Sequence, residues 1–120
     1  MSDFTRAAAL IGPAIADKRP LWTLDGLRRD YEAGVAKLWT GERSAMLFNF
    51  TDYLDTGERV IEVGPAGGDL REIMAHVPWF EAEARRVGAT QAHITGRRGW
   101  ARQLRELGYE EWATIVRKIL

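Results

Sequence analysis

Six consecutive residues in the middle of the chain have the features of an anion-binding turn. Residues 59–63, Arg-Val-Ile-Glu-Val, have the composition of a strand, and the turn Gly64-Pro-Ala-Gly-Gly-Asp69 follows at once. Helical spacing begins at Leu70, so Asp69 takes the N-cap position, where its carboxylate accepts a backbone N–H. A glycine turn before a helix presents amides and the positive end of the helix dipole to an anion.

Two side chains near this turn could transfer protons. Glu62 lies in the strand directly before the turn, and His93 lies in a second predicted strand at residues 90–95. Both side-chain types can accept a proton, and the histidine could act as a base or a relay. The alternative is that both are ordinary solvated or packed strand residues. His76, on the intervening helix, is a weaker candidate.

The apolar spacing predicts the elements that position these residues. Helices are expected at residues 4–15, 24–33, 70–87 and 99–107, and strands at residues 37–40, 45–53, 59–63, 90–95 and 109–119. A helix joins the strands at 59–63 and 90–95, so these two should run parallel, while the earlier strands form an antiparallel meander. The sequence therefore predicts one mixed α/β domain over residues 1–120, with a mostly antiparallel sheet of about five strands flanked by about four helices.

Composition excludes several classes of protein. The 17 basic residues balance the 17 acidic ones, so the net charge gives no nucleic-acid signature. There is no cysteine, the two histidines are far apart, and we expect no metal site. No apolar run approaches the roughly 18 to 20 residues of a membrane span, so a soluble, cytoplasmic protein is expected. The motifs of P-loop kinases, zinc proteases and serine hydrolases are missing from the sequence.

The order of elements, the glycine turn and the closing segment Gly96-Arg-Arg-Gly-Trp-Ala-Arg-Gln-Leu-Arg-Glu-Leu-Gly-Tyr109 resemble the GCN5-related N-acetyltransferase (GNAT) family. The resemblance implies a GNAT-like fold over roughly residues 5–119. It also implies acetyl-CoA as the cofactor, bound through backbone amides of the turn, and an active member would use Glu62 and His93 in catalysis. The cofactor-binding residues that it implies are Val63, Gly64, Ala66, Gly67, Gly68 and Asp69.

The sequence departs from the family pattern at four points. Asp69 falls where the family loop has glycine or alanine, and its carboxylate would repel a diphosphate; a register shifted by one residue would leave it purely as a cap. Leu104 stands in place of the tyrosine that protonates the leaving thiolate, and Arg97 in place of an asparagine that helps to hold the cofactor. The family's initial strand is not expected either. An active enzyme would need an open V-shaped gap between residues 58–64 and 90–95, which Trp100 would close in a structural protein.

Five tryptophans are many for a chain of this length, and some of them are expected to contact a protein partner. The alternative for each is burial in the core. The chain is similar to short, degenerate GNAT-like proteins encoded among the structural genes of tailed phages and prophages. That similarity favours a non-catalytic, virion-associated or protein-binding role over an active N-acetyltransferase, and a location in the virion if the chain is phage-encoded. The candidate partner contacts are Trp79, Phe80, Trp100, Arg97 and Arg98.

Overall fold

The computed structural model describes residues 3–120, with the side chain of Arg98 outside that description. The described elements, in order, are α1 (Asp3–Ile15), α2 (Leu24–Glu32), β1 (Lys37–Thr40), β2 (Ser44–Tyr53), β3 (Glu58–Gly68), α3 (Leu70–Arg86), β4 (Gln91–Ile94), α4 (Arg98–Leu104) and the short 3-10 helix η1 (Arg105–Leu107). This is the predicted mixed α/β architecture, and the described residues contain four strands where about five were expected. None of the described helices is long and apolar enough to cross a membrane.

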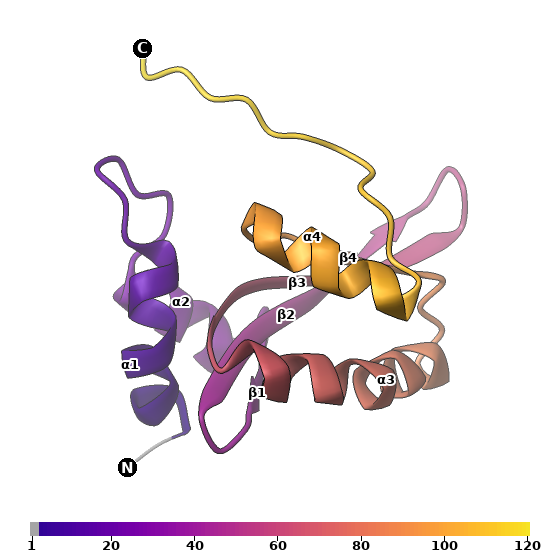
Figure 1. The fold of residues 1–120 in the computed structure, drawn as a ribbon, viewed down its shortest axis with the longest axis horizontal. Coiled ribbons are helices and arrows are strands. Elements are labelled where there is room, and N and C mark those ends of the chain that lie inside the picture. Colours follow the sequence, from indigo (N-terminus) through magenta and orange to yellow (C-terminus); the bar gives the residue numbers. More distant parts are fainter. Residues whose placement is uncertain (1–2) are drawn as a thin grey trace.

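The sheet has the strand order β1-β2-β3-β4 (Figure 1). β1, β2 and β3 pair antiparallel, whereas β3 and β4 pair parallel through α3, as the sequence predicted. The parallel register places Glu62 opposite His93 and Val63 opposite Ile94.

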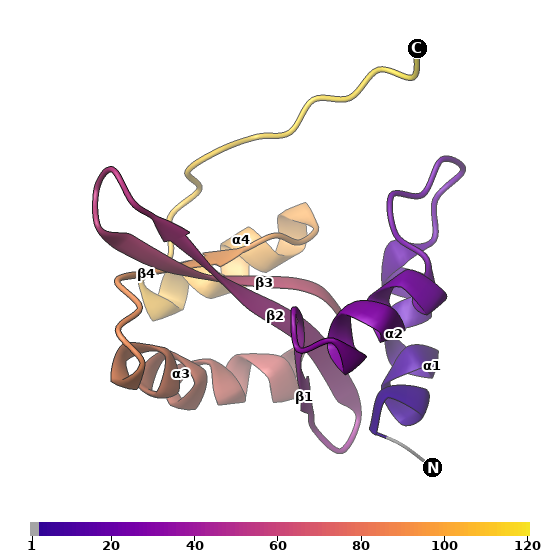
Figure 2. The same cartoon turned by 180° about the vertical axis from the view of Figure 1, so that it is seen from behind.

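Helices cover both faces of the sheet. In Figure 1 α3 and α4 lie in front of the strands, and Figure 2 shows α2 in front of the opposite face with α1 at its side. Each layer has its own buried cluster, because successive side chains of a strand point to opposite faces. One cluster joins α1 and α2 to β2 through Phe4, Ala7, Ile11, Leu27, Ala45 and Leu47. The other joins α3 to β2 and β3 through Met46, Ile61, Val63, Ile73, Phe80 and Ala84.

The predicted helix starts are confirmed. The Thr23 side chain accepts a hydrogen bond from the Gly26 amide at 3.0 Å and so caps α2. Asp69 caps α3 in the same way. Pro13 and Pro78 both lie inside continuous helices, α1 and α3.

The strand that precedes the glycine turn is longer than predicted. The sequence indicated an end at Gly64, but β3 continues along β2 as far as Gly68. Between the pairs of Met46 with Ala66 and Phe48 with Val63, two steps on β2 oppose three steps on β3. A β-bulge therefore absorbs the extra residue beside the cis Gly64-Pro65 bond, where local sequence indicated a break.

The last predicted strand, at residues 109–119, is not formed. Residues 110–120, which we call the C-terminal segment, are extended and have neither helix nor strand. Figure 1 shows this segment running from the end of α4 away from the sheet. The strand prediction is therefore wrong, because no described strand pairs with this segment.

The environment of Tyr109, which directly precedes this segment, leads us to expect that the protein loses stability in alkali. Its half-buried hydroxyl donates to Glu81 Oε2 at 2.9 Å, and burial first, then the Glu81 carboxylate, raises the pKa of the phenol. Folding thus favours the protonated phenol, so its contribution is complete below about pH 10 and is lost as the pH rises further. Between pH 9 and 11, urea unfolding should show that wild type loses roughly 0.5–1 kcal/mol more stability than Tyr109→Phe, which has no phenol to ionise. The loss is this small because solvent screens a half-buried group. Equal losses in the two proteins would contradict this.

Candidate cofactor and acceptor site

Asp69 uses its carboxylate within the protein. Its Oδ1 accepts the backbone amides of Arg71 at 2.9 Å and Glu72 at 3.4 Å, which are two of the first-turn donors of α3. Its Oδ2 accepts Arg43 Nε at 3.2 Å, and its own amide donates to the Arg43 carbonyl at 3.1 Å. The Arg43 guanidinium, together with those two amides, holds the pKa of the carboxyl below its ordinary value. Asp69 is thus an ionised cap whose partners come from α3 and from the β1–β2 turn.

Glu72 ties the same β1–β2 turn to α3. Its carboxylate accepts the backbone amides of Glu42 at 3.2 Å and Arg43 at 2.9 Å, and also the Ser44 hydroxyl. These bonds, led by that of Ser44, lower the pKa of the Glu72 carboxyl. Sequence reasoning missed Arg43 and Glu72. The spacing Asp69-x-x-Glu72 is that of a capping box, but Glu72 contacts a neighbouring turn instead of the N-cap amide.

Gly67 and Gly68 belong to the sheet instead of an open loop. They are the β3 partners of Ala45 and Ser44. A Cβ on Gly67 would overlap the carbonyl oxygen of Leu10 in α1, and Gly68, at φ +107°, stands against the Arg43 carbonyl. The predicted cofactor residues Val63, Gly64, Ala66, Gly67, Gly68 and Asp69 therefore lie along the end of β3 and at the cap of α3, and α1 packs directly on Gly67.

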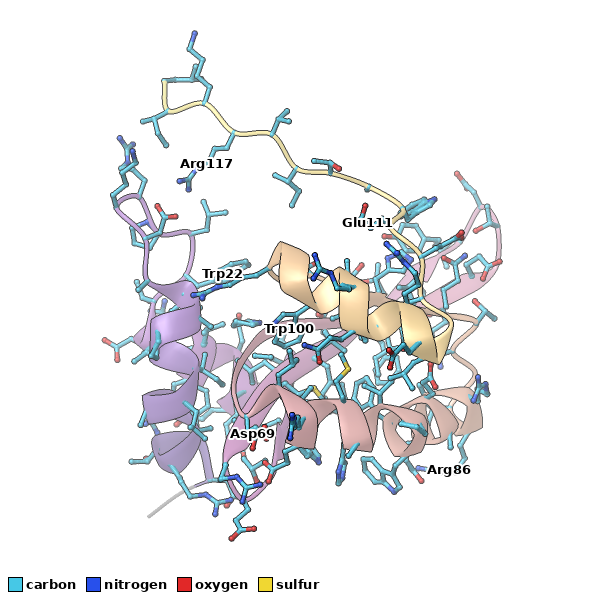
Figure 3. All side chains as sticks on the ribbon, in the orientation of Figure 1. Trp22, Asp69, Arg86, Trp100, Glu111 and Arg117 are labelled. Atoms are coloured by element: carbon cyan, nitrogen blue, oxygen red, sulfur yellow. The ribbon has the colours of Figure 1, made fainter. Side chains whose placement is uncertain are left out.

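Trp100 lies where β3 and β4 separate. Their ladder ends at Val63 and Ile94, and the Thr95 amide still reaches the Val63 carbonyl at 3.2 Å. Beyond this point the chain turns into α4. The indole of Trp100 packs against the α3-side cluster, and a Cβ added at Gly96 would come within 3.0 Å of it. Figure 3 shows Trp100 below α4, on the side toward β3. A large apolar side chain thus lies beside the point where the two strands separate.

The two positions of the last helix at which the resemblance implies polar functional groups do not place such groups beside the separating strands. Leu104, at the position where the resemblance implies an acidic tyrosine, is buried. Arg97, at the asparagine position, is exposed at the start of α4 and makes no side-chain cap. A groove of about 500 Å³ lies between α3 and the end of α4. It is lined by Arg71, Met74, Ala75, Gln103, Glu106 and Leu107.

Glu62 and His93, the two predicted proton-transfer residues, are brought together. They are register partners on adjacent parallel strands. They lie on the face opposite to Ile61, which packs under α3, and so away from the α3–α4 groove. His93 Nε2 is 3.0 Å from Gln91 Oε1, and its ring centroid lies 5.2 Å from that of Trp112. Among the described residues, no group of three or more acidic, histidine or cysteine side chains could hold a metal ion.

The expected partner contacts divide into surface and core. Trp79 is 54% exposed, and its ring is tilted against that of His76 with centroids 5.4 Å apart; the His76 ring lies 4.5 Å from that of Trp39. Phe80 corrects the prediction, because it is 3% exposed and packs edge-on against Phe48. Trp100 is half-buried and Arg97 is exposed, while the Arg98 side chain lies outside the described residues.

Neither a protein-family model nor a curated protein matches this sequence. Solved structures do match. An acetyltransferase of Trypanosoma brucei aligns with a TM-score of 0.69 and 12% identity, over 98% of this chain and 93% of its own. Glucosamine-6-phosphate N-acetyltransferase of Arabidopsis thaliana aligns with a TM-score of 0.67 and 10% identity, over 97% and 91%. A predicted acetyltransferase of Clostridium acetobutylicum, solved with acetyl-CoA, aligns with 0.65 and 8%, over 98% and 92%. At these identities the likeness concerns the backbone, and the fold of this chain is that of the GNAT acetyltransferases.

Proposed function

We propose that this chain keeps the GNAT fold without acetyl transfer and acts as a protein-binding component. One observation carries the proposal: the Asp69 carboxylate holds the first-turn amides of Arg71 and Glu72. These amides sit at the helix end where an anion would otherwise bind, and Asp69 brings a negative charge to the same place. An acetyl-CoA diphosphate would have to displace the cap and overcome that charge.

Neighbouring residues support the same conclusion. Pro65, at the bulge, has no backbone N–H to offer to an acyl oxygen. Trp100 packs on the α3-side cluster beside the point where β3 and β4 separate, and Leu104 has no proton to give to a leaving thiolate. The site therefore fits acetyl-CoA poorly, and we assign it no catalytic step.

A second candidate function, an acetyl-CoA-dependent N-acetyltransferase, is favoured by one observation. Glu62 and His93 face each other across the β3–β4 ladder on the sheet face away from α3. A carboxylate beside an imidazole could accept the proton of an attacking amine. This candidate requires that cofactor binding displace the Asp69 cap.

Calorimetric titration with acetyl-CoA separates the two functions. We expect no micromolar binding by wild type and at least tenfold tighter binding by Asp69→Gly, which removes both the charge and the cap. Asp69→Asn keeps a capping side chain and removes the charge, so it should gain less if the occupied amides are the main obstacle.

Glu83→Gln is the matched control, since it removes one carboxylate at the far end of α3, where Glu83 pairs with Arg86. It should leave binding unchanged. Micromolar binding by wild type, followed by acetylation of amines that Glu62→Gln abolishes, would overturn the proposal in favour of the second candidate.

The protein-binding part of the proposal rests on the row of Trp39, His76 and Trp79 at the junction of β1 and α3, in which Trp79 is exposed and the other two rings are partly buried. Tryptophan contributes disproportionately to protein interfaces, and an indole that is half exposed has area left to bury. Association with a phage virion stays a prediction from the sequence.

A further inference from the structure

β4 presents an open edge of the sheet. It is the terminal strand in the order β1-β2-β3-β4, and its four residues, Gln91–Ile94, pair on one side with β3. No strand of the described residues lies along its other side. An edge of this kind displays backbone N–H and C=O groups that another extended segment can bind.

The same chain carries an extended segment that lacks a strand partner. Within the C-terminal segment, the exposed fractions are 77% for Trp112, 83% for Ile115 and 90% for Val116. Ile119 and Leu120 are exposed as well. Large β-branched and aromatic side chains in an extended backbone are those of a strand, and their exposure in one isolated copy leaves apolar area to be covered.

The segment meets its own β4 at one point and then leaves it. Trp112 lies on His93, with ring centroids 5.2 Å apart. Farther along, Arg117 makes two hydrogen bonds to the Asp17 carboxylate, of 3.0 and 3.2 Å, in the α1–α2 connection. Figure 3 shows Arg117 beside that connection, at the opposite end of the segment from Glu111. Residues 113–116 therefore bridge away from the β4 edge instead of following it.

We propose that two copies of this chain exchange their C-terminal segments, with residues 113–119 of each copy added as a strand to the β4 edge of the other. Each chain offers one free edge and one free strand, so a two-fold symmetric pair satisfies both at once. In such a strand Ile115 and Ile119 share one face with Arg117 between them, and the two isoleucines can extend the apolar face that Ala92 and Ile94 form over α3. Arg117 would exchange its intrachain contact for solvent or for the partner.

This inference does not rest on the proposed function. The β4 edge lies two strands away from β2, whose turn residue Arg43 holds Asp69, and the exchange involves none of the cap contacts. A failed exchange would leave the acetyl-CoA titration unaffected.

Light scattering of the purified protein at about 100 µM tests the assembly. Wild type should have twice the 13.6 kDa mass of one chain. The double variant Ile115→Asp, Val116→Asp should have the single-chain mass and keep the helical circular dichroism signal of the folded domain, because both side chains are exposed in one copy. Leu54→Asp, at an equally exposed apolar residue in the β2–β3 turn, is the matched control and should stay dimeric. A monomeric wild type, or a double variant that remains dimeric, would overturn the proposal.

Cross-linking identifies the surfaces, and the absence of native cysteines leaves it without background. Gln91→Cys and Val116→Cys are made as separate proteins, mixed, and treated with a short bismaleimide, which tolerates a shift in register. We expect a covalent heterodimer from the mixture. In the double-cysteine protein we expect linked pairs of chains. A closed single chain instead would mean that the segment folds onto its own β4, and that outcome contradicts the exchange.

Discussion

Gly67→Ala is expected to lower the free energy of unfolding by about 3 kcal/mol or to prevent folding altogether. A Cβ at Gly67 would overlap the backbone carbonyl of Leu10, and it would approach Ile11 Cα as well. A backbone obstacle cannot rotate away as a side chain can, so α1 itself would have to move off β3. Ile11 of α1 is completely buried, which makes this movement costly. Urea unfolding followed by tryptophan fluorescence measures the loss.

Gly99→Ala is the matched control for this substitution. Gly99 lies in α4, and a Cβ there would meet no atom within 4 Å. Alanine is preferred over glycine inside a helix, so this variant should be neutral or more stable by up to about 1 kcal/mol. If Gly67→Ala proved as stable as Gly99→Ala, α1 would not be packed on β3 as described.

Local patterns in the sequence predicted the elements whose signals are themselves local. Thr23 and Asp69 start helices because a short polar side chain can cap a nearby amide, and that property is encoded within three residues. The parallel pairing of β3 with β4 followed from the helix that joins them. The same register placed Glu62 beside His93, so this part of the candidate site was also predictable.

The remaining features depend on contacts between distant segments. β3 continues through Gly68 because it pairs with β2 and packs against α1. The glycine-rich sequence of the turn does not encode either contact. The pairing of Asp69 with Arg43 joins residues that are 26 positions apart. The strand expected at 109–119 failed for the converse reason: its composition suits a strand, but pairing needs a neighbour, and the described chain provides none.

Phe80→Ala should lower the free energy of unfolding by about 3–4 kcal/mol, whereas Trp79→Ala should cost less than about 1 kcal/mol. The two residues are adjacent in α3, and both were expected at a partner surface. Phe80 falls on the helix face of Ile73, Val77 and Ala84 and packs 4.9 Å, ring to ring, from Phe48. Truncation there leaves a cavity in the core, which guanidinium unfolding would detect.

Trp79 lies one position, and so about 100°, around the helix from Phe80, on the face that carries His76. Its removal uncovers mostly solvated surface and should spare the fold while weakening any protein contact that the Trp39–His76–Trp79 row makes. Losses of similar size in the two variants would mean that Trp79 is covered in the folded protein, and the row would then be part of a core instead of a binding surface. Since a difference of one residue decides between the two roles, the phase of α3 against the sheet, and not aromatic content, determines which tryptophans are available to a partner.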